Sequence, residues 1–393
     1  MDPTTTSLDA AGNHRRALAV LREQRPVLND VRPLIWHLEV TGKCNLSCTY
    51  CQRDFFVRSG HSFDQRHMAD EVFQAVRPQF GSARLVALTA FLGEPLLTPT
   101  LPAWWRQVAE SGASPQVTTN GSFLSADMAE LFAATGGRVK MSIDSFDQVT
   151  LDRLRPRPNG RRGVVAAELG DRLALLESAR RRHPGRDLQL GVNIVVTSAN
   201  LHSIVDTMEE CLRRARIDLF TLLAFRVPRD ERGRFHEAAA DLSLRFDDEA
   251  VRAAWRRILS WSAGRARSDG TRFTFPYARA DWRALLGEEV EALYADQFEE
   301  VNDGEVPADS YHCCVPWLKV HVTIGGDVVP CHLLEWAEPG TSVGNVLETP
   351  FDQLWDGPAY RDLRARLAGP DKPSFCRECK SWWRHYTPQR VAW

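Results

Sequence analysis

Three cysteines, Cys44, Cys48 and Cys51, stand close together in the sequence. They follow an apolar, β-prone stretch at 34–40, so one short loop after a strand would carry all three thiols. Structural zinc sites usually take their ligands from separate pairs that complete a tetrahedron. Three cysteines this close instead fit a cuboidal iron–sulfur cluster with one iron left open for a substrate or cofactor. A zinc knuckle, or three reduced cysteines packed in a core, is the alternative.

The segment CNLSCTYC at 44–51 resembles the signature of the radical SAM enzymes. In that family the open iron binds the amino and carboxylate groups of S-adenosylmethionine (SAM). An electron from the cluster cleaves SAM, and the resulting 5′-deoxyadenosyl radical abstracts a hydrogen atom from the substrate. The protein supplies position and water exclusion. The resemblance therefore implies a [4Fe-4S] cluster, SAM and an electron donor such as flavodoxin or ferredoxin.

Polar residues also stand where further strands are expected to end. The segment Leu92-Gly93-Glu94-Pro95 resembles the family's Gly-Gly-Glu-Pro motif, whose backbone and glutamate hold the amino group of SAM, although Leu92 replaces the first glycine. An ordinary turn before a helix would explain the same residues. The other positions expected near SAM are Tyr50, Asn120, Ser142, Asp144 and Asn193, from the resemblance, and Arg155, which could reach a carboxylate. Turn capping or core packing is the alternative role for most of them.

A second group of cysteines lies towards the end of the chain. Cys313 and Cys314 precede an apolar run and a Gly-Gly-Asp turn, Cys331 follows a second apolar run, and Cys376 and Cys379 form a CxxC pair. The two runs that flank the turn predict a β-hairpin. Four thiolates would fully ligate a [4Fe-4S] cluster, and zinc fits the same spacing equally well.

This second region resembles the SPASM/Twitch extension of radical SAM enzymes. The likeness rests on its Cys-x-x-P-W opening, its Gly-x-x-x-x-Cys hairpin and its later G-N-V…W…R segment. It implies an auxiliary [4Fe-4S] cluster held by Cys313, Cys331, Cys376 and Cys379. No cysteine follows Cys379, which resembles the shorter Twitch-like form with one auxiliary cluster. Cys314 is then spare, and it is the candidate catalytic residue because a thiol could return a hydrogen atom to a substrate radical.

Apolar β-prone runs alternate with amphipathic helical stretches, which predicts right-handed βαβ units and a parallel sheet. The predicted strands are 34–40, 85–91, 116–119, 139–143, 189–196 and 219–225. The predicted helices are 14–25, 64–76, 101–110, 125–134, 164–182, 201–214 and 247–261. Six units fit the α/β partial (βα)6 barrel that the resemblance implies, followed by a small SPASM/Twitch-like domain with a β-hairpin and a helix.

We expect four regions along the chain. They are an N-terminal helical extension at 1–30, the radical SAM core at 31–226, a connecting region with candidate substrate contacts at 227–312, and the auxiliary-cluster domain and tail at 313–393. The 393 residues, 44% of them hydrophobic, suffice for one large domain and a smaller one.

Charge and composition narrow the function classes. The net charge of −2 implies no general attraction to nucleic acid or to an anionic membrane. The first residues lack the apolar region of a signal peptide, and no stretch approaches the length of a membrane span. Nine cysteines without a secretion signal favour a reducing cytoplasm and metal ligation over disulfides. We therefore expect a cytoplasmic enzyme with a small-molecule substrate and no nucleic-acid or membrane partner.

A fully ligated auxiliary cluster has no iron free for SAM, so its best physical use is as an electron acceptor or conduit. After hydrogen abstraction from a carbon that bears a hydroxyl, loss of a proton and an electron gives a ketone. The single auxiliary cluster resembles the aminocyclitol dehydrogenases of antibiotic biosynthesis. We therefore expect an oxidoreductase acting on an alcohol carbon of an aminocyclitol, sugar or similar small molecule.

Other reactions fit the same motifs. They include a radical epimerase with Cys314 as hydrogen donor, a dehydratase or decarboxylase acting on a sugar or nucleoside, and a peptide maturase. A SAM-binding or iron–sulfur scaffold without catalysis is a different class, and Glu94 together with the cysteine triad argues against it. A peptide maturase would be expected to carry a leader-binding module, for which the stretch before the first strand is short.

Overall fold

The computed structural model describes residues 12–13, 31–51, 53, 64–89, 93–158, 163–225, 241–275, 313, 315–331, 341–374 and 376. The predicted helix at 14–25 and most of the connecting region lie outside these residues. In the part of the chain that is described, no helix combines the length and the hydropathy that a bilayer crossing requires.

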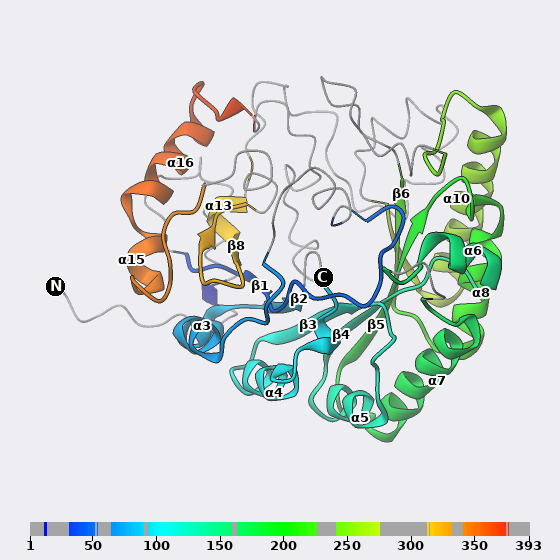
Figure 1. Cartoon of the computed structure of the whole chain (residues 1–393), viewed down its shortest axis with the longest axis horizontal. Coiled ribbons are helices and arrows are strands. Elements are labelled where there is room, and N and C mark those ends of the chain that lie inside the picture. Colours follow the sequence, from blue (N-terminus) through cyan, green and yellow to red (C-terminus); the bar gives the residue numbers. More distant parts are fainter. Residues whose placement is uncertain are drawn as a thin grey trace.

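A single curved sheet of nine strands organises the described residues (Figure 1). Its strand order is β7-β6-β5-β4-β3-β2-β1-β8-β9. Every neighbouring pair is parallel except β8 and β9, which are antiparallel. The strands are β1 (Ile35–Glu39), β2 (Leu85–Thr89), β3 (Ser114–Thr119), β4 (Gly137–Ser142), β5 (Leu188–Val196), β6 (Leu219–Ala224), β7 (Arg272–Thr274), β8 (Lys319–Val322) and β9 (Val328–Val329).

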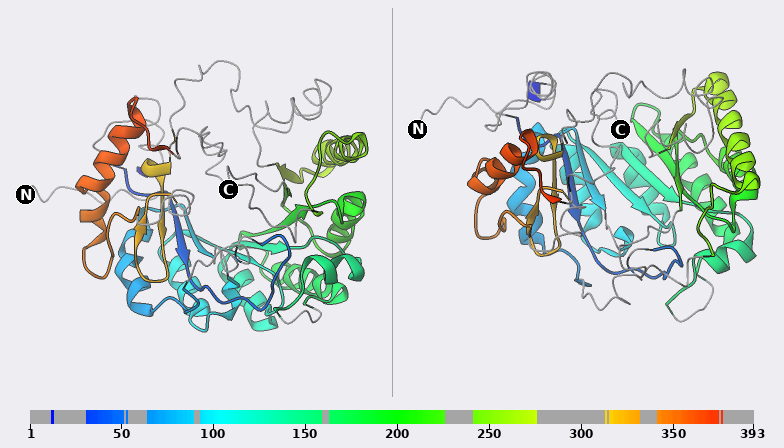
Figure 2. Two further views of the ribbon diagram at one scale, coloured as in Figure 1. Left: turned by 45° about the horizontal axis from the view of Figure 1, so that its top comes forward. Right: turned by 90° about the horizontal axis from the view of Figure 1, so that it is seen from above.

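Helices cover the convex side of this sheet, as the two views of Figure 2 show. Those between β1 and β7 are α3 (Asp70–Val76), η1 (Arg77–Ser82), η2 (Pro95–Leu97), α4 (Leu101–Glu110), α5 (Ala126–Thr135), α6 (Gln148–Leu154), α7 (Ala166–Arg182), η3 (Leu201–Ser203), α8 (Ile204–Arg214) and α10 (Glu249–Asp269). Those near the end of the chain are α13 (Val315–Leu318), α15 (Phe351–Trp355) and α16 (Pro358–Ala368).

The strands present different chemistry to their two sides. Val139 and Met141 of β4 belong to the large apolar core that includes Trp104 and Phe132 of the covering helices. Because successive side chains of a strand point to opposite faces, Lys140 and its alternating neighbours on β4 lie on the concave side. The same alternation puts polar residues of several strands on that side, among them His37, Glu39, Ser142, Asn193 and His321. The fold therefore surrounds a polar concave face with an apolar shell.

The parallel α/β fold predicted from the sequence is confirmed. All six predicted strands form, and α4 occupies the range predicted for it, Leu101–Glu110. The pairing of β1 to β6 in chain order is that of a partial (βα)6 barrel. The structure adds elements that the sequence analysis missed, among them α6 and β7.

The predicted C-terminal hairpin is also present, and it extends the main sheet. β8 pairs in parallel with β1 in the register Ile35 to Lys319, and β9 returns antiparallel to β8. Gly326 makes the hairpin turn with a φ of +92°, a conformation that favours glycine. Helix α15 packs against the same region, since the ring of Phe351 lies 4.4 Å from that of Trp36. The hairpin thus completes an edge of the barrel sheet, while the four-region division stays a prediction.

Candidate cluster and SAM site

The loop that carries Cys44, Cys48 and Cys51 leaves the carboxyl end of β1. All three cysteine side chains are partly exposed. The loop is tied to the end of α6, because the backbone N–H of Thr49 donates to the carbonyl of Leu154 at 3.0 Å. The Thr49 hydroxyl also donates to the carbonyl of Arg153 at 2.7 Å. Helix α6, which the sequence analysis did not predict, is therefore part of the scaffold of this loop.

The electrostatics of the loop show that the three thiols lie near one another. Burial raises the pKa of the Cys48 thiol, the charge of Arg155 lowers it, and Cys51 and Cys44 raise it. Burial likewise raises the pKa of Cys44, to which Glu94 and Cys51 add. Thiols must lose their protons to bind metal, so iron would offset these effects when it binds.

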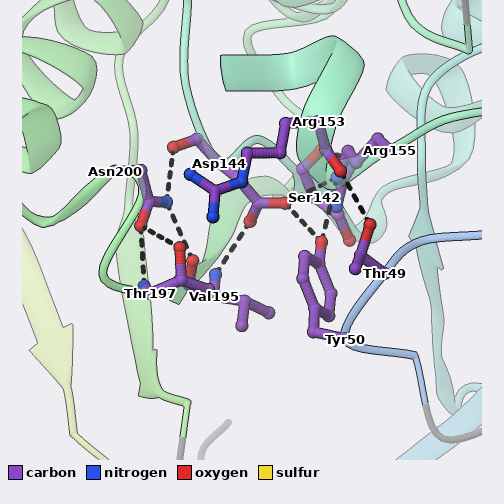
Figure 3. A network of polar contacts seen from close by, with 9 residues as sticks. All are labelled: Thr49, Tyr50, Ser142, Asp144, Arg153, Arg155, Val195, Thr197 and Asn200. Atoms are coloured by element: carbon purple, nitrogen blue, oxygen red, sulfur yellow. Dashed lines mark hydrogen bonds and ion pairs between the residues drawn. The ribbon is translucent and has the colours of Figure 1, made fainter. Parts of the chain in front are cut away.

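A buried network holds the residue beside the third cysteine (Figure 3). Arg155 donates from Nε to Oδ2 of Asp144 at 2.6 Å and from Nη1 to the carbonyl of Ser142 at 2.6 Å. The Tyr50 hydroxyl donates to the same carboxylate oxygen of Asp144. Burial raises the pKa of Tyr50, so the phenol stays protonated as a donor. The pair of Asp144 and Arg155 is almost fully buried, with 0% and 4% of the side chains exposed.

Asp144 also connects strand ends. Its Oδ1 accepts the backbone N–H of Val195 at 2.8 Å, and its carbonyl accepts Nδ2 of Asn200 at 2.9 Å (Figure 3). The carboxyl ends of β4 and β5 are therefore fixed to each other and, through Tyr50, to the cysteine loop. The sequence analysis proposed Tyr50, Asp144 and Arg155 as separate contacts of SAM, whereas the structure brings them together as one network.

Glu94 occupies a second buried position and is 1% exposed. Its Oε1 accepts the N–H of Leu96 at 3.0 Å and the hydroxyl of Thr119 at 2.6 Å, and its Oε2 accepts the N–H of Asn120 at 2.7 Å. Burial raises the pKa of this carboxyl, and the three hydrogen bonds oppose the rise. Glu94 thus joins the start of η2, which begins at the buried Pro95, to the carboxyl end of β3.

Asn120 links this position to the cysteine loop. Its Nδ2 donates to Oδ1 of Asn45 at 2.9 Å, and its Oδ1 accepts the N–H of Ser122 at 2.9 Å. The N–H of Glu94 donates to the carbonyl of Lys43 at 2.7 Å. Asn45 and Thr119 were not among the predicted site residues, although both stand inside or beside the quoted motifs. The described contacts of Glu94 and Asn120 therefore hold the cysteine loop in place. Gly93 directly precedes Glu94 in the chain.

Two buried polar atoms near these strand ends have no hydrogen-bond partner among the described residues. Asn193 stands beside Ser142 in the register of β4 and β5. Its Oδ1 is buried and has no hydrogen-bond partner among the described residues, and the same holds for the hydroxyl of Ser122. Buried polar atoms in native proteins are normally paired, so both atoms fit a polar ligand at this edge. The three cysteine thiols and these two atoms together fit an open-iron cluster with bound SAM.

Cys331 and Cys376 of the auxiliary set lie at the opposite end of β1. Cys331 and Cys376 pack against an apolar cluster made of Val31, Leu34, Ile35, Leu85, Trp317, Leu318, Leu363 and Leu367. The sulfur of Cys313 accepts the N–H of Val315 at 3.4 Å. Cys314 and Cys379 lie outside the described residues. Within the described ranges no three His, Cys, Asp or Glu side chains gather around one ion position, and cluster ligands need not do so because each thiolate binds its own iron.

Two family models match the chain. The model of the radical SAM superfamily matches residues 38–211, and that of the SPASM iron-sulfur cluster-binding domain matches residues 313–380. The protein is a radical SAM enzyme with a SPASM domain. These two domains imply SAM and [4Fe-4S] clusters as cofactors, in agreement with the sequence prediction and with the fit of the residues above.

Relatives of this radical SAM enzyme carry several different names. An AdoMet-dependent heme synthase of Methanosarcina barkeri is 24% identical over 348 residues, which cover 86% of this chain and 85% of the relative. A GTP 3′,8-cyclase of Rippkaea orientalis is 31% identical over 127 residues, which cover 30% of this chain and 36% of the relative.

Solved structures share the fold, among them the following two. Streptococcus suis SuiB bound to S-adenosylmethionine superposes with a TM-score of 0.60 at 16% identity, covering 94% of this chain and 75% of SuiB. The enzyme anSMEcpe with bound AdoMet and a peptide gives a TM-score of 0.58 at 16% identity, covering 90% of this chain and 88% of that one.

Proposed function

We propose that the protein is a radical SAM oxidoreductase that oxidises an alcohol carbon of an aminocyclitol, sugar or similar small molecule in natural-product biosynthesis. The auxiliary [4Fe-4S] cluster would accept the electron that the substrate radical loses. We also infer that a flavodoxin or ferredoxin supplies the electron for SAM cleavage and that the enzyme works in the cytoplasm. The enzyme class rests on the two domains, and the proposed reaction rests on the placement of the two cysteine sets relative to β1.

The two cysteine sets lie at opposite ends of β1, and this position carries the proposal. The triad follows the carboxyl end of β1, while Cys331 and Cys376 pack against a cluster that contains Ile35, the first residue of β1. A strand of five residues spans about 13 Å at ~3.3 Å per residue. Ile35, His37 and Glu39 alternate with Trp36 and Leu38, so they share the concave side. This arrangement supports an electron path along the face on which a substrate would lie.

Bound SAM and the two clusters would supply hydrogen-atom abstraction and electron transfer. The chain's own residues hold the reacting groups in place. Cys44, Cys48 and Cys51 would ligate three irons, and the hydrogen bonds of Glu94 and Asn120 fix their loop. Asn193 and Ser142 would hold polar groups of SAM at the ends of β5 and β4. The polar concave side supports a small hydroxylated substrate, because such a ligand needs hydrogen-bond partners when water is excluded.

The electron and proton count gives a sharp test. Oxidation removes one hydrogen atom, one proton and one electron from the substrate, so the product is two mass units lighter. The reconstituted enzyme, reduced and supplied with SAM, would be assayed by mass spectrometry on a panel of aminocyclitols and sugars. We expect one 5′-deoxyadenosine per product and no deuterium at the reacting carbon in heavy water. Cys314→Ala should keep most of this activity, while Cys376→Ala should stop product formation.

The opposite result would point to epimerisation. An epimerase returns a hydrogen atom to the same carbon, and a thiol donor exchanges its proton with water. A product of unchanged mass that carries one deuterium from heavy water, and that disappears in Cys314→Ala, would overturn the oxidoreductase proposal.

A role in heme synthesis is a second candidate, favoured by one comparison. The match to the AdoMet-dependent heme synthase spans 86% of this chain, whereas that to the GTP 3′,8-cyclase of Rippkaea orientalis spans 30%. The same reaction mixture supplied with tetrapyrrole precursors would decide between the candidates. A heme product, seen by its visible absorption, together with inactivity towards every alcohol of the panel, would favour this second function.

A further inference from the structure

Arg364 of α16 is a fully buried cation, with 0% of its surface exposed. Its guanidinium lies between two rings, with its central carbon 4.5 Å from the ring centroid of Trp355 and 4.9 Å from that of Tyr360. Nε donates to the carbonyl of Pro316 at 3.0 Å, and Nη1 donates to the carbonyl of Trp355 at 3.0 Å. Both acceptors are neutral. Burial lowers the pKa of Arg364; Asp356, which pairs with Arg32, raises that pKa through its charge but accepts none of these hydrogen bonds.

Two hydrogen-bond donor atoms at this site have no acceptor among the described residues. Nη2 of Arg364 and the hydroxyl of Tyr360 are both buried, and neither has a hydrogen-bond partner among the described residues. Leaving such a donor unsatisfied destabilises the folded chain, and a buried charge without compensation does so more strongly. Two open donors four residues apart on one helix therefore indicate an acceptor, preferably an anionic one, at this place.

Cys331 and Cys376 of the auxiliary set lie near the same helix. Pro316, which accepts from Arg364, stands three residues after Cys313 in the chain. The thiol of Cys331 lies close enough to Tyr360 to raise the pKa of its phenol, in addition to the larger effect of burial. Leu363 and Leu367 of the same helix belong to the apolar cluster against which Cys331 and Cys376 pack. Figure 1 shows α13 and α16 next to each other beside β8.

We propose that Arg364 and Tyr360 donate hydrogen bonds to the sulfur atoms of the auxiliary cluster or its thiolates and thereby raise its reduction potential. A cube with four thiolates carries net negative charge, and reduction adds one more. A fixed guanidinium and a phenol O–H stabilise the more negative state, because hydrogen bonds to the sulfurs and local charge set the potential of such a cluster. This effect would make the auxiliary cluster a better electron acceptor.

The test measures the potential of this cluster by itself. Full-length protein with Cys44, Cys48 and Cys51 replaced by alanine keeps only the auxiliary ligands. After anaerobic reconstitution, the midpoint potential is measured by a redox titration followed by electron paramagnetic resonance. We expect Arg364→Gln to shift the midpoint to more negative values by at least a tenfold change in the equilibrium constant, about 59 mV for one electron. Tyr360→Phe should shift it less and in the same direction.

Arg361→Gln provides a matched control. Arg361 lies on the same helix and is exposed, so its replacement changes the net charge equally without touching the buried site. Its midpoint should equal that of the parent. An unchanged midpoint in Arg364→Gln with normal iron content would overturn the proposal and leave Arg364 a purely structural role. If Arg364→Gln does not fold, Tyr360→Phe decides, because it removes one oxygen and keeps the ring; an unchanged midpoint there would also overturn the proposal.

Discussion

At the scale of single residues, the buried pair of Asp144 and Arg155 sets the geometry next to the third cysteine. Asp144→Asn would leave the guanidinium in the interior without its carboxylate, and breaking a buried pair in this way costs roughly 3–5 kcal/mol. We expect that loss in the free energy of unfolding, measured by urea titration of the metal-free chain. The double variant Asp144→Asn/Arg155→Leu should recover part of it, and equal losses in both variants would show that the two residues are not coupled.

Glu94 provides a prediction for SAM binding. In Glu94→Gln an NH2 group replaces one carboxylate oxygen, so it must face the N–H of Asn120 or the donors of Leu96 and Thr119. An unsatisfied buried donor costs roughly 1–3 kcal/mol. Because Asn120 braces the cysteine loop, we expect weaker SAM binding to the reconstituted enzyme by calorimetry. Glu110→Gln at the exposed end of α4 is the control. Equal affinities in the two variants would contradict a role for Glu94.

The sequence predicted the chemical role of these residues better than it predicted their hydrogen-bond partners. The spacing of Cys44, Cys48 and Cys51 alone indicated a cluster, because three thiols in one loop have few other uses. Glu94 was expected to hold the amino group of SAM, yet its oxygens accept three donors of the protein. Arg155 was expected to reach a carboxylate of the cofactor, and the carboxylate it reaches is that of Asp144. Such pairings depend on how distant loops pack, which motifs do not encode.

At the scale of elements, periodicity was enough for the long helices and for the strands of the barrel. It missed α6 and β7 because segments of seven and three residues hold too few turns or alternations to show a period. The start of α6 does carry a local signal, since Asp147 accepts the N–H of Thr150 at 2.8 Å as an N-cap. The pairing of β8 with β1 had no local signal at all, and it turned an expected separate hairpin into part of the main sheet.

Acid should lower the free energy of unfolding through a residue at the pairing of β8 with β1. Burial lowers the pKa of His321 on β8 to about 3, and the charge of Lys319 acts in the same direction. An unfolded histidine titrates near 6.5, so below about pH 6.5 the unfolded chain takes up a proton that the folded chain refuses. The free energy of unfolding should therefore fall as the pH drops from about 6.5 towards 3, by at most about 1.4 kcal/mol per pH unit.

The variant His321→Gln isolates this effect. It cannot titrate, so its stability should depend less on pH over the same interval, measured by denaturant unfolding of the metal-free chain at several pH values. Hydrogen exchange of the β8 amides should show the same difference between the variant and the parent. Identical pH dependence in the two proteins would remove His321 as the acid-sensitive group.

At the scale of the whole molecule, two separate cysteine sets predict two separate clusters. Anaerobically reconstituted protein should contain about eight irons per chain, four for each cube. Replacing Cys44, Cys48 and Cys51 by alanine should leave about half of the iron, because the C-terminal ligands lie at the other end of β1. Metal analysis of both proteins checks this. One equivalent of zinc in the triple variant, in place of four irons, would contradict an auxiliary cluster.

The pairing of β1 with β8 has a consequence for how the chain folds during synthesis. One edge of β1 pairs with β2, and its other edge pairs with Lys319 to Val322. These residues leave the ribosome long after the barrel helices, so the second edge stays unpaired until then. Until then, β1 offers unpaired backbone groups to any other strand, and contacts between residues this distant in sequence form slowly. Nascent chains stalled before β8 should therefore bind chaperones more strongly than chains stalled after β9. A strand made late in synthesis would thus protect β1.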